Sequence, residues 1–128
     1  MIAVGAVFAA LAALVHVLIF YLESMAWTTP RGRAVFGTTR EEAENTRELA
    51  FNQGFYNLFL ALQVAAGVVL LLAGATGTGV ALVLAGTASM AAAATVLAVT
   101  SPEKRSAAMK QGVFPMIAVV LTAVGLIV

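Results

Sequence analysis

Four apolar stretches, each close to the length that a helix needs to cross a bilayer, dominate this chain of 128 residues. They cover residues 2–24, 49–73, 80–99 and 109–128, and short polar segments separate them. A transmembrane helix needs about 20 consecutive apolar residues, because each residue advances the helix by about 1.5 Å. The sequence therefore predicts an all-α membrane protein, with residues 1–128 forming one domain of four antiparallel transmembrane helices in an up-down bundle.

The composition agrees with this prediction. Hydrophobic residues make up 62% of the chain and charged residues 10%, whereas a soluble domain has about 45–50% apolar and about 25% charged residues. The chain has no Cys, one His and a net charge of +1. Thiolate metal sites are therefore excluded, and no basic field for nucleic acid exists. We expect no metal, no cofactor and no nucleic-acid partner, and membrane lipid as the surroundings.

A secretory signal peptide is the alternative interpretation of the first stretch. Ser24 and Ala26 satisfy the small-residue rule for cleavage. However, no Lys or Arg precedes the apolar run, the run exceeds the usual length of about 7–15 residues, and it contains His16. We therefore interpret it as a membrane span.

The basic residues predict the orientation of the bundle. All seven Lys and Arg residues lie in or at the edge of two connecting segments, four between the first and second stretches and three between the third stretch and the start of the fourth. These two segments share one side of the membrane, and cytoplasmic loops carry the excess of Lys and Arg. We therefore expect both charged segments in the cytoplasm, and both termini outside the cell membrane.

Turn and capping signals divide the connecting segments. Residues 28–33 (TTPRGR) and 74–79 (GATGTG) read as turns because of their Pro and Gly residues. Thr39 and Glu42 fit a capping box, which predicts a short interfacial helix beginning near Arg40, before the second span. Pro115 predicts a kink or a late start in the fourth span.

A polar stripe opens the second stretch. On an α-helix, at about 100° per residue, five polar side chains fall within an arc of roughly 140°: Asn52, Gln53, Tyr56, Asn57 and Gln63. Within hydrocarbon, such side chains turn toward other helices or toward a water-filled cavity. The stripe therefore predicts one wall of an intramembrane polar site.

Two ionisable residues of the first stretch belong to the same site. His16 and Glu23 point in nearly the same direction, with Trp27 on the same stripe, but they differ by about 10 Å in height. Matching heights across antiparallel helices predicts an outer layer of Glu23, Asn52, Gln53 and Gln111, and a deeper layer of His16, Tyr56 and Asn57, with Gln63 below both. We expect a neutral His16 that hydrogen-bonds to Tyr56 or Asn57, and aromatic side chains around the site.

These residues also have simpler interpretations. Membrane Asn and Gln side chains often only join helices, at about 0.6 kcal/mol per hydrogen bond, and Glu23 suits an interfacial charge that reaches water. His16 lies near the middle of its span, however, and an intramembrane ionisable residue is by default a functional hypothesis. The nine ligand-binding candidates are His16, Glu23, Trp27, Asn52, Gln53, Tyr56, Asn57, Gln63 and Gln111. Catalytic residues are not identified, although His16 and Glu23 are the candidates.

The third stretch carries small residues at four-residue spacing: Ala81, Ala85, Ser89 and Ala93. Small residues at this spacing let membrane helices approach closely. We expect this ridge to pack tightly, either inside the bundle or against a second copy in a homodimer.

The polar landmarks resemble those of a small bacterial membrane family catalogued as domain of unknown function 1304. The resemblance covers nearly the whole chain and rests on four segments: HVLIFYLESMAW at 16–27, TTPRGRAVFG at 28–37, NQGFYN at 52–57 and QGVFP at 111–115. It implies four spans in a bacterial inner membrane and assigns no activity.

The sequence leaves three functions open. The leading one is the binding, extending to translocation, of a small amphipathic or weakly charged ligand in a cleft in the cytoplasmic half. The alternative is an intramembrane acid–base enzyme, such as a double-bond isomerase, that uses His16 and Glu23. Four-helix sterol isomerases are similar to this arrangement in architecture only. The third is a structural subunit that packs against membrane partners.

Overall fold

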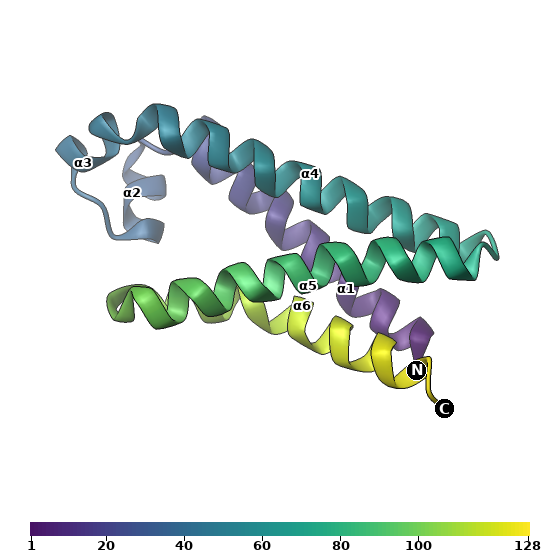
Figure 1. Cartoon of the computed structure of the whole chain (residues 1–128). Helices are drawn as coiled ribbons and strands as arrows, with labels where there is room; N and C mark the ends of the chain where they lie inside the picture. Colours follow the sequence, from purple (N-terminus) through teal and green to yellow (C-terminus); the bar gives the residue numbers. More distant parts are fainter.

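The computed structural model describes residues 1–128 and is entirely helical (Figure 1). The helices are α1 (Ile2–Phe20), the π-helical turn η1 (Tyr21–Met25), α2 (Pro30–Phe36), α3 (Arg40–Asn45), α4 (Arg47–Leu72), α5 (Thr76–Thr100), the 3₁₀ turn η2 (Pro102–Lys104) and α6 (Arg105–Gly125). Four of them, α1 with η1, α4, α5 and α6 with η2, are long and apolar enough to cross a membrane. The predicted four-span fold is confirmed, and the chain is a multi-pass membrane protein by these criteria.

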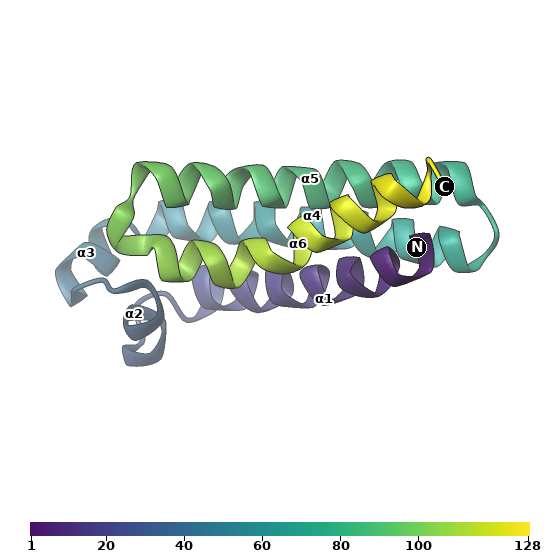
Figure 2. The same ribbon diagram turned by 90° about the horizontal axis from the view of Figure 1, so that it is seen from below.

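Each long helix packs against two antiparallel neighbours. The order around the bundle is α1, α4, α5, α6 and back to α1. In Figures 1 and 2, α2, α3 and the α5–α6 connection lie at one end of the bundle, and the two termini lie with the α4–α5 turn at the other. All seven Lys and Arg residues belong to the first of these ends, which we call the charged end. The second is called the terminal end.

The interior of the bundle consists mainly of small side chains. Ala9, Ala12 and Ala118 are fully buried, together with the larger Val64 and Met90. Large apolar side chains such as Leu72 and Val99 point outward. Lipid tails are as apolar as Leu, so close packing of small residues associates membrane helices better than burial of large ones does.

The segment at 28–33, predicted to be a turn, is the start of helix α2. The Thr29 hydroxyl accepts a hydrogen bond from the Gly32 N–H at 3.1 Å, and Pro30 takes the first helical position. Gly37 ends α2 with a φ of 66°. Thr29 is therefore the N-cap of α2, Pro30 its first residue and Gly37 its stop signal, so the turn predicted at 28–33 is wrong.

The capping box predicted at Thr39 is confirmed. The Thr39 hydroxyl accepts from the Glu42 N–H at 3.2 Å, and the Glu42 carboxylate accepts from the Thr39 N–H at 2.8 Å. The resulting helix α3 is short, because the backbone leaves helical geometry at Thr46 before α4 begins.

The Gly-rich connection between the second and third spans is shorter than predicted. Only Ala73–Ala75 lie outside the helices, and Gly74 adopts a φ of 82°. Gly79 instead lies inside α5, where an added Cβ would come within 2.8 Å of the Leu71 N and 2.9 Å of the Gly67 O. This glycine therefore serves a close helix contact. The fourth span likewise begins earlier than 109, at Arg105, and it continues through the buried Pro115.

The small-residue ridge of the third span does not form a packed contact within the bundle, although Ala93 at its end lines a cavity between the helices. Ala81, Ala85, Ser89 and Ala93 are all exposed. The face that α5 buries includes Gly86, Thr87, Met90, Ala91 and Ala94. The intramolecular version of the prediction is therefore wrong, because the glycines of α5 allow a closer approach than alanines do. The homodimer version stays a prediction.

Candidate functional site

A cavity of about 540 Å³ occupies the charged end of the bundle. All four long helices contribute to its wall, and residues of α2 and η2 lie at its mouth. Figure 1 shows α4 and α5 diverging toward this end. The volume falls within the range of small-molecule pockets, about 300–1,000 Å³.

The structure brings together six of the nine candidate ligand-binding residues. The cavity is lined by His16, Glu23, Trp27, Gln53, Asn57 and Gln111, whereas Asn52, Tyr56 and Gln63 lie outside it. The six come from α1, η1, α4, α6 and the segment before α2. Residues far apart in the sequence therefore share one cavity.

His16 lies at the deep end of the cavity and is only 2% exposed. Its Nδ1 lies 2.9 Å from the Ala12 carbonyl oxygen, one turn earlier on the same helix. Because a carbonyl oxygen only accepts, Nδ1 carries a proton, and Nε2 is an acceptor when the ring is neutral. The predicted hydrogen bond to Tyr56 or Asn57 is wrong, and Nε2 has no partner within the chain.

Glu23 lies nearer the mouth, in the π-helical turn η1, and is 8% exposed. Its Oε2 accepts a hydrogen bond of 2.8 Å from Asn57 Nδ2. Asn57 therefore belongs to the level of Glu23, and its predicted place in the deeper layer beside His16 is wrong. Single π-helical turns within helices often occur at functional sites. No feature of the sequence predicted the one at Tyr21–Met25.

A close contact between α4 and the end of α1 explains the shift in level. An added Cβ on Gly54 would meet the Ser24 hydroxyl, and would come within 3.1 Å of both the Phe20 O and the Ser24 N. The Ser24 hydroxyl also donates to the Phe51 carbonyl at 2.9 Å. These contacts set Gly54 opposite Ser24, so that Asn57, one turn deeper on α4, reaches Glu23.

The polar stripe of α4 splits into two parts. Gln53 and Asn57 line the cavity, whereas Tyr56 is 72% exposed and points away from the bundle. Asn52 bonds only to a carbonyl of its own helix, and Gln63 lies 3.5 Å from the Leu82 carbonyl. The face that α4 buries consists of small residues: Ala50, Gly54, Ala61 and Gly67, with Val64. An arc of roughly 140° is wider than the part of α4 that faces the cavity.

Only two aromatic side chains line the cavity, so the predicted aromatic enclosure is largely wrong. Trp27 and Phe36 pack at the mouth with ring centroids 4.9 Å apart. The Trp27 indole N–H donates to the Thr46 hydroxyl at 3.1 Å, which connects the mouth to the start of α4. The phenylalanines of α4 pack against one another outside the cavity, with centroids 5.1 and 6.2 Å apart.

The mouth also carries charged residues that are not among the nine candidates. Glu103, Lys104 and Lys110 line it, from η2 and the first turns of α6. The nearby Glu42 has a pKa below the ordinary value, first because of its hydrogen bond from the Thr39 backbone and to a smaller extent because of Lys104. For Glu103, Lys104 and Lys110, the only signal in the sequence was their position in a short loop at the same end of the bundle as Glu23. No group of three or more His, Asp or Glu residues could hold a metal ion.

Comparison with known proteins gives one match. The family model described as "Protein of unknown function (DUF1304)" matches residues 10–123. This range includes the greater part of each of the four long helices. The resemblance noted in the sequence is confirmed. Neither curated proteins nor solved structures give a significant match.

Proposed function

The chain belongs to the DUF1304 family, and from the cavity of this member we propose that it binds a small amphipathic or weakly charged ligand at the charged end. The proposal rests on one observation: a single cavity combines apolar walls with His16 and the hydrogen-bonded pair of Glu23 and Asn57. Pockets for small molecules are usually built this way, with mainly apolar walls and a few placed polar groups.

The polar groups would act at different depths. At the deep end, His16 Nε2 offers an acceptor without a partner. Glu23 and Asn57 follow nearer the mouth, where Gln53 and Gln111 add amide donors and acceptors. The wall between them is apolar, through Ile19, Leu60, Met90 and Leu97. A ligand with an apolar body and a polar group would match this arrangement of polar groups and apolar wall.

The positive-inside rule supports a cytoplasmic charged end in the inner membrane, so the ligand would enter from the cytoplasm. Translocation requires more than the cavity. The helices of the terminal end would have to separate at contacts such as Gly67 against Val83, where an added Cβ would come within 2.8 Å of the Val83 N. The geometry therefore supports binding more directly than transport.

One observation favours an intramembrane acid–base enzyme as the second candidate. His16 presents a free ring nitrogen to the same cavity that holds the Glu23 carboxyl. A general base must reach the proton that it takes, and both groups are accessible to one ligand. An isomerase would use one of them to remove a proton and the other to return one.

Mass spectrometry of an organic extract of the purified protein tests the binding proposal. We expect a small molecule that co-purifies with the wild type and with Tyr56→Ala, which alters an exposed side chain on α4. His16→Gln and Asn57→Ala should lose it while circular dichroism shows an unchanged fold. The proposal fails if both of these variants retain the molecule at wild-type occupancy. Conversion of a lipid extract, lost in His16→Gln, would favour the enzyme.

A further inference from the structure

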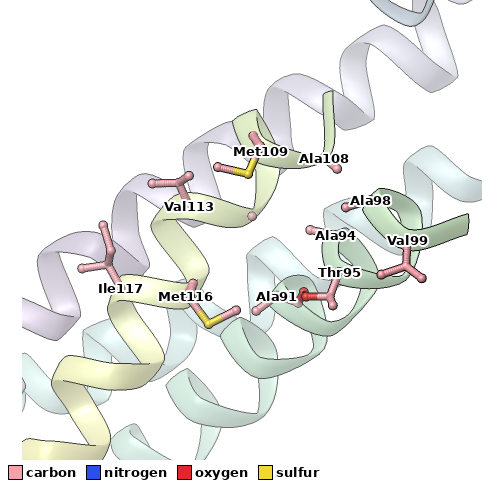
Figure 3. A pocket seen from close by; sticks show the side chains of 11 residues that line it. Ala91, Ala94, Thr95, Ala98, Val99, Ala108, Met109, Val113, Met116 and Ile117 are labelled. Atoms are coloured by element: carbon pink, nitrogen blue, oxygen red, sulfur yellow. The ribbon is translucent and has the colours of Figure 1, made fainter. Parts of the chain in front are cut away.

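A second hollow lies on the outer surface of the bundle, between α5 and α6 (Figure 3). It is a groove of about 330 Å³, with walls from the last turns of α5 and the first turns of α6. It begins near Ala98 and Met109 and extends to Ala91 and Ile117, a length of about 12 Å along the helices. It shares no lining residue with the cavity of His16 and Glu23.

The groove presents almost no polar surface. Thr95 carries the only polar side chain among its lining residues, and the Thr95 hydroxyl donates to the Ala91 carbonyl at 2.8 Å. That hydroxyl therefore needs no further partner. A hydrocarbon chain fits such a surface, because it leaves no polar group without a hydrogen bond.

Arg105 marks the head of the groove at the charged end. It lies on the face of α6 that carries Met109, Gly112 and Met116, since residues four, seven and eleven apart share a helix face. Its Nε donates to the carbonyl of Ala98, a residue of the opposite wall, at 3.0 Å. This bond holds the guanidinium beside Ala98, at the charged end of the groove, and no hydrogen bond occupies its two terminal nitrogens. Lys104 and Lys110 line the other cavity instead.

We propose that this groove binds one anionic phospholipid, with an acyl chain between α5 and α6 and the headgroup phosphate on Arg105. A guanidinium recognises phosphate through two parallel hydrogen bonds, which a lysine cannot provide. The apolar groove and the cation at its head match the two parts of a phospholipid in the leaflet on the charged side. This site is independent of the proposed function.

Native mass spectrometry of the full chain in non-ionic detergent tests this site. Phosphatidylglycerol and phosphatidylcholine with identical acyl chains are titrated separately, and bound lipid is counted. A basic residue near the membrane surface contributes about 1 kcal/mol to binding of anionic lipid, so we expect about a fivefold preference for phosphatidylglycerol. Arg105→Gln should abolish the preference. Arg31→Gln, the same charge change at an exposed position of α2, should retain it.

A second variant tests the acyl-chain groove. Thr95→Phe should fill the groove and lower the binding of both lipids several-fold, with circular dichroism confirming the fold. Glycerol phosphate, which has the charge but no chain, should not compete. The proposal is overturned if Arg105→Gln keeps the preference, if Arg31→Gln loses it equally, if Thr95→Phe binds both lipids undiminished, or if glycerol phosphate displaces the lipid.

Discussion

The two ends of this bundle consist of the same four helices, but the terminal end is closely packed and the charged end encloses a cavity. At the terminal end, backbones approach closely at glycines: an added Cβ on Gly5 would come within 3.1 Å of the Thr122 N, and one on Gly67 within 2.8 Å of the Val83 N. At the charged end, Gly54 keeps α4 close to the end of α1 and Gly112 keeps α6 close to Ala94 of α5, while α4 and α5 diverge around a cavity of about 540 Å³ (Figure 1). The position of the close contacts therefore decides where an intramembrane cavity forms.

The chemistry of the two ends differs in the same direction. The buried Glu23 has the Asn57 amide as a partner, and Gln53 and Gln111 surround it. At the terminal end the buried Thr122 hydroxyl has no hydrogen-bond partner. Glu23 and Asn57 thus pair inside the charged end, whereas the terminal end gains its stability from packing.

The largest effect is expected from adding a side chain at a glycine of the terminal end. Gly67→Val should destabilise the protein by about 3 kcal/mol, because the backbone of α5 stands where the side chain would go and overpacking carries costs of this order. Gly77→Val, on the first turn of α5 with nothing within 4 Å of its position, is the matched control. Thermal unfolding in detergent measures both. Equal unfolding temperatures would show that the terminal end is not closely packed.

The next largest effect is expected from removing a hydrogen-bond partner at the charged end. Asn57→Ala leaves the buried Glu23 carboxyl without its hydrogen bond, so we expect a loss of about 1–2 kcal/mol. Asn52→Ala, on the same helix, removes only a bond to a carbonyl of its own helix and should be nearly neutral. Unfolding by a denaturing detergent compares the two. A neutral Asn57→Ala would mean that water already satisfies Glu23.

The sequence predicted the spans, their antiparallel order and the shared end of the charged segments, because length, hydropathy and charge are local properties. It also predicted that His16, Glu23, Gln53, Asn57 and Gln111 would face one site. It did not predict which of them meet. That depends on the close approach at Gly54 and on the π-helical turn, and both arise from packing between helices that are distant in the sequence.

The same limit explains two errors. Tyr56 falls on the polar arc of α4, yet its side chain points outward, because the small residues on α4 occupy the inner face. The Ala81–Ala93 ridge has the spacing of a packing face, but α5 turns Gly79 and Gly86 inward instead. A pattern on one helix identifies a special face, and the neighbouring helices decide what that face meets.

A smaller effect is expected on the outer face of α5. Ala85→Leu should change the stability of the dilute monomer by less than about 0.5 kcal/mol, because the side chain lies outside the bundle. The predicted homodimer through this face is tested by cross-linking single Ala85→Cys copies in membranes. Cross-linked dimers would support it, and their absence alongside efficient labelling of the same thiol would contradict it.

The smallest effect concerns the capping box outside the membrane spans. Hydrogen bonds with Thr39 lower the pKa of Glu42. A carboxyl with a lowered pKa in the folded state adds stability above its unfolded pKa, about 4.3 for Glu, and loses it as the pH falls through the lowered value. Acidification should therefore release α3 at its first turn. Thr39→Ala removes the hydroxyl but keeps the N–H, so the Glu42 pKa should rise part of the way. An NMR titration showing an ordinary Glu42 pKa in the wild type would contradict the cap.

Thiol labelling tests the difference between the two ends most directly, because the chain contains no Cys and the background is therefore zero. Gln111→Cys and Thr122→Cys lie eleven residues apart on the same face of α6, one lining the cavity and the other buried at the terminal end. A water-soluble maleimide, applied to the folded protein in detergent, should label Gln111→Cys rapidly and leave Thr122→Cys unmodified until unfolding. Equal labelling rates at the two positions would contradict a bundle that is open at one end and closed at the other.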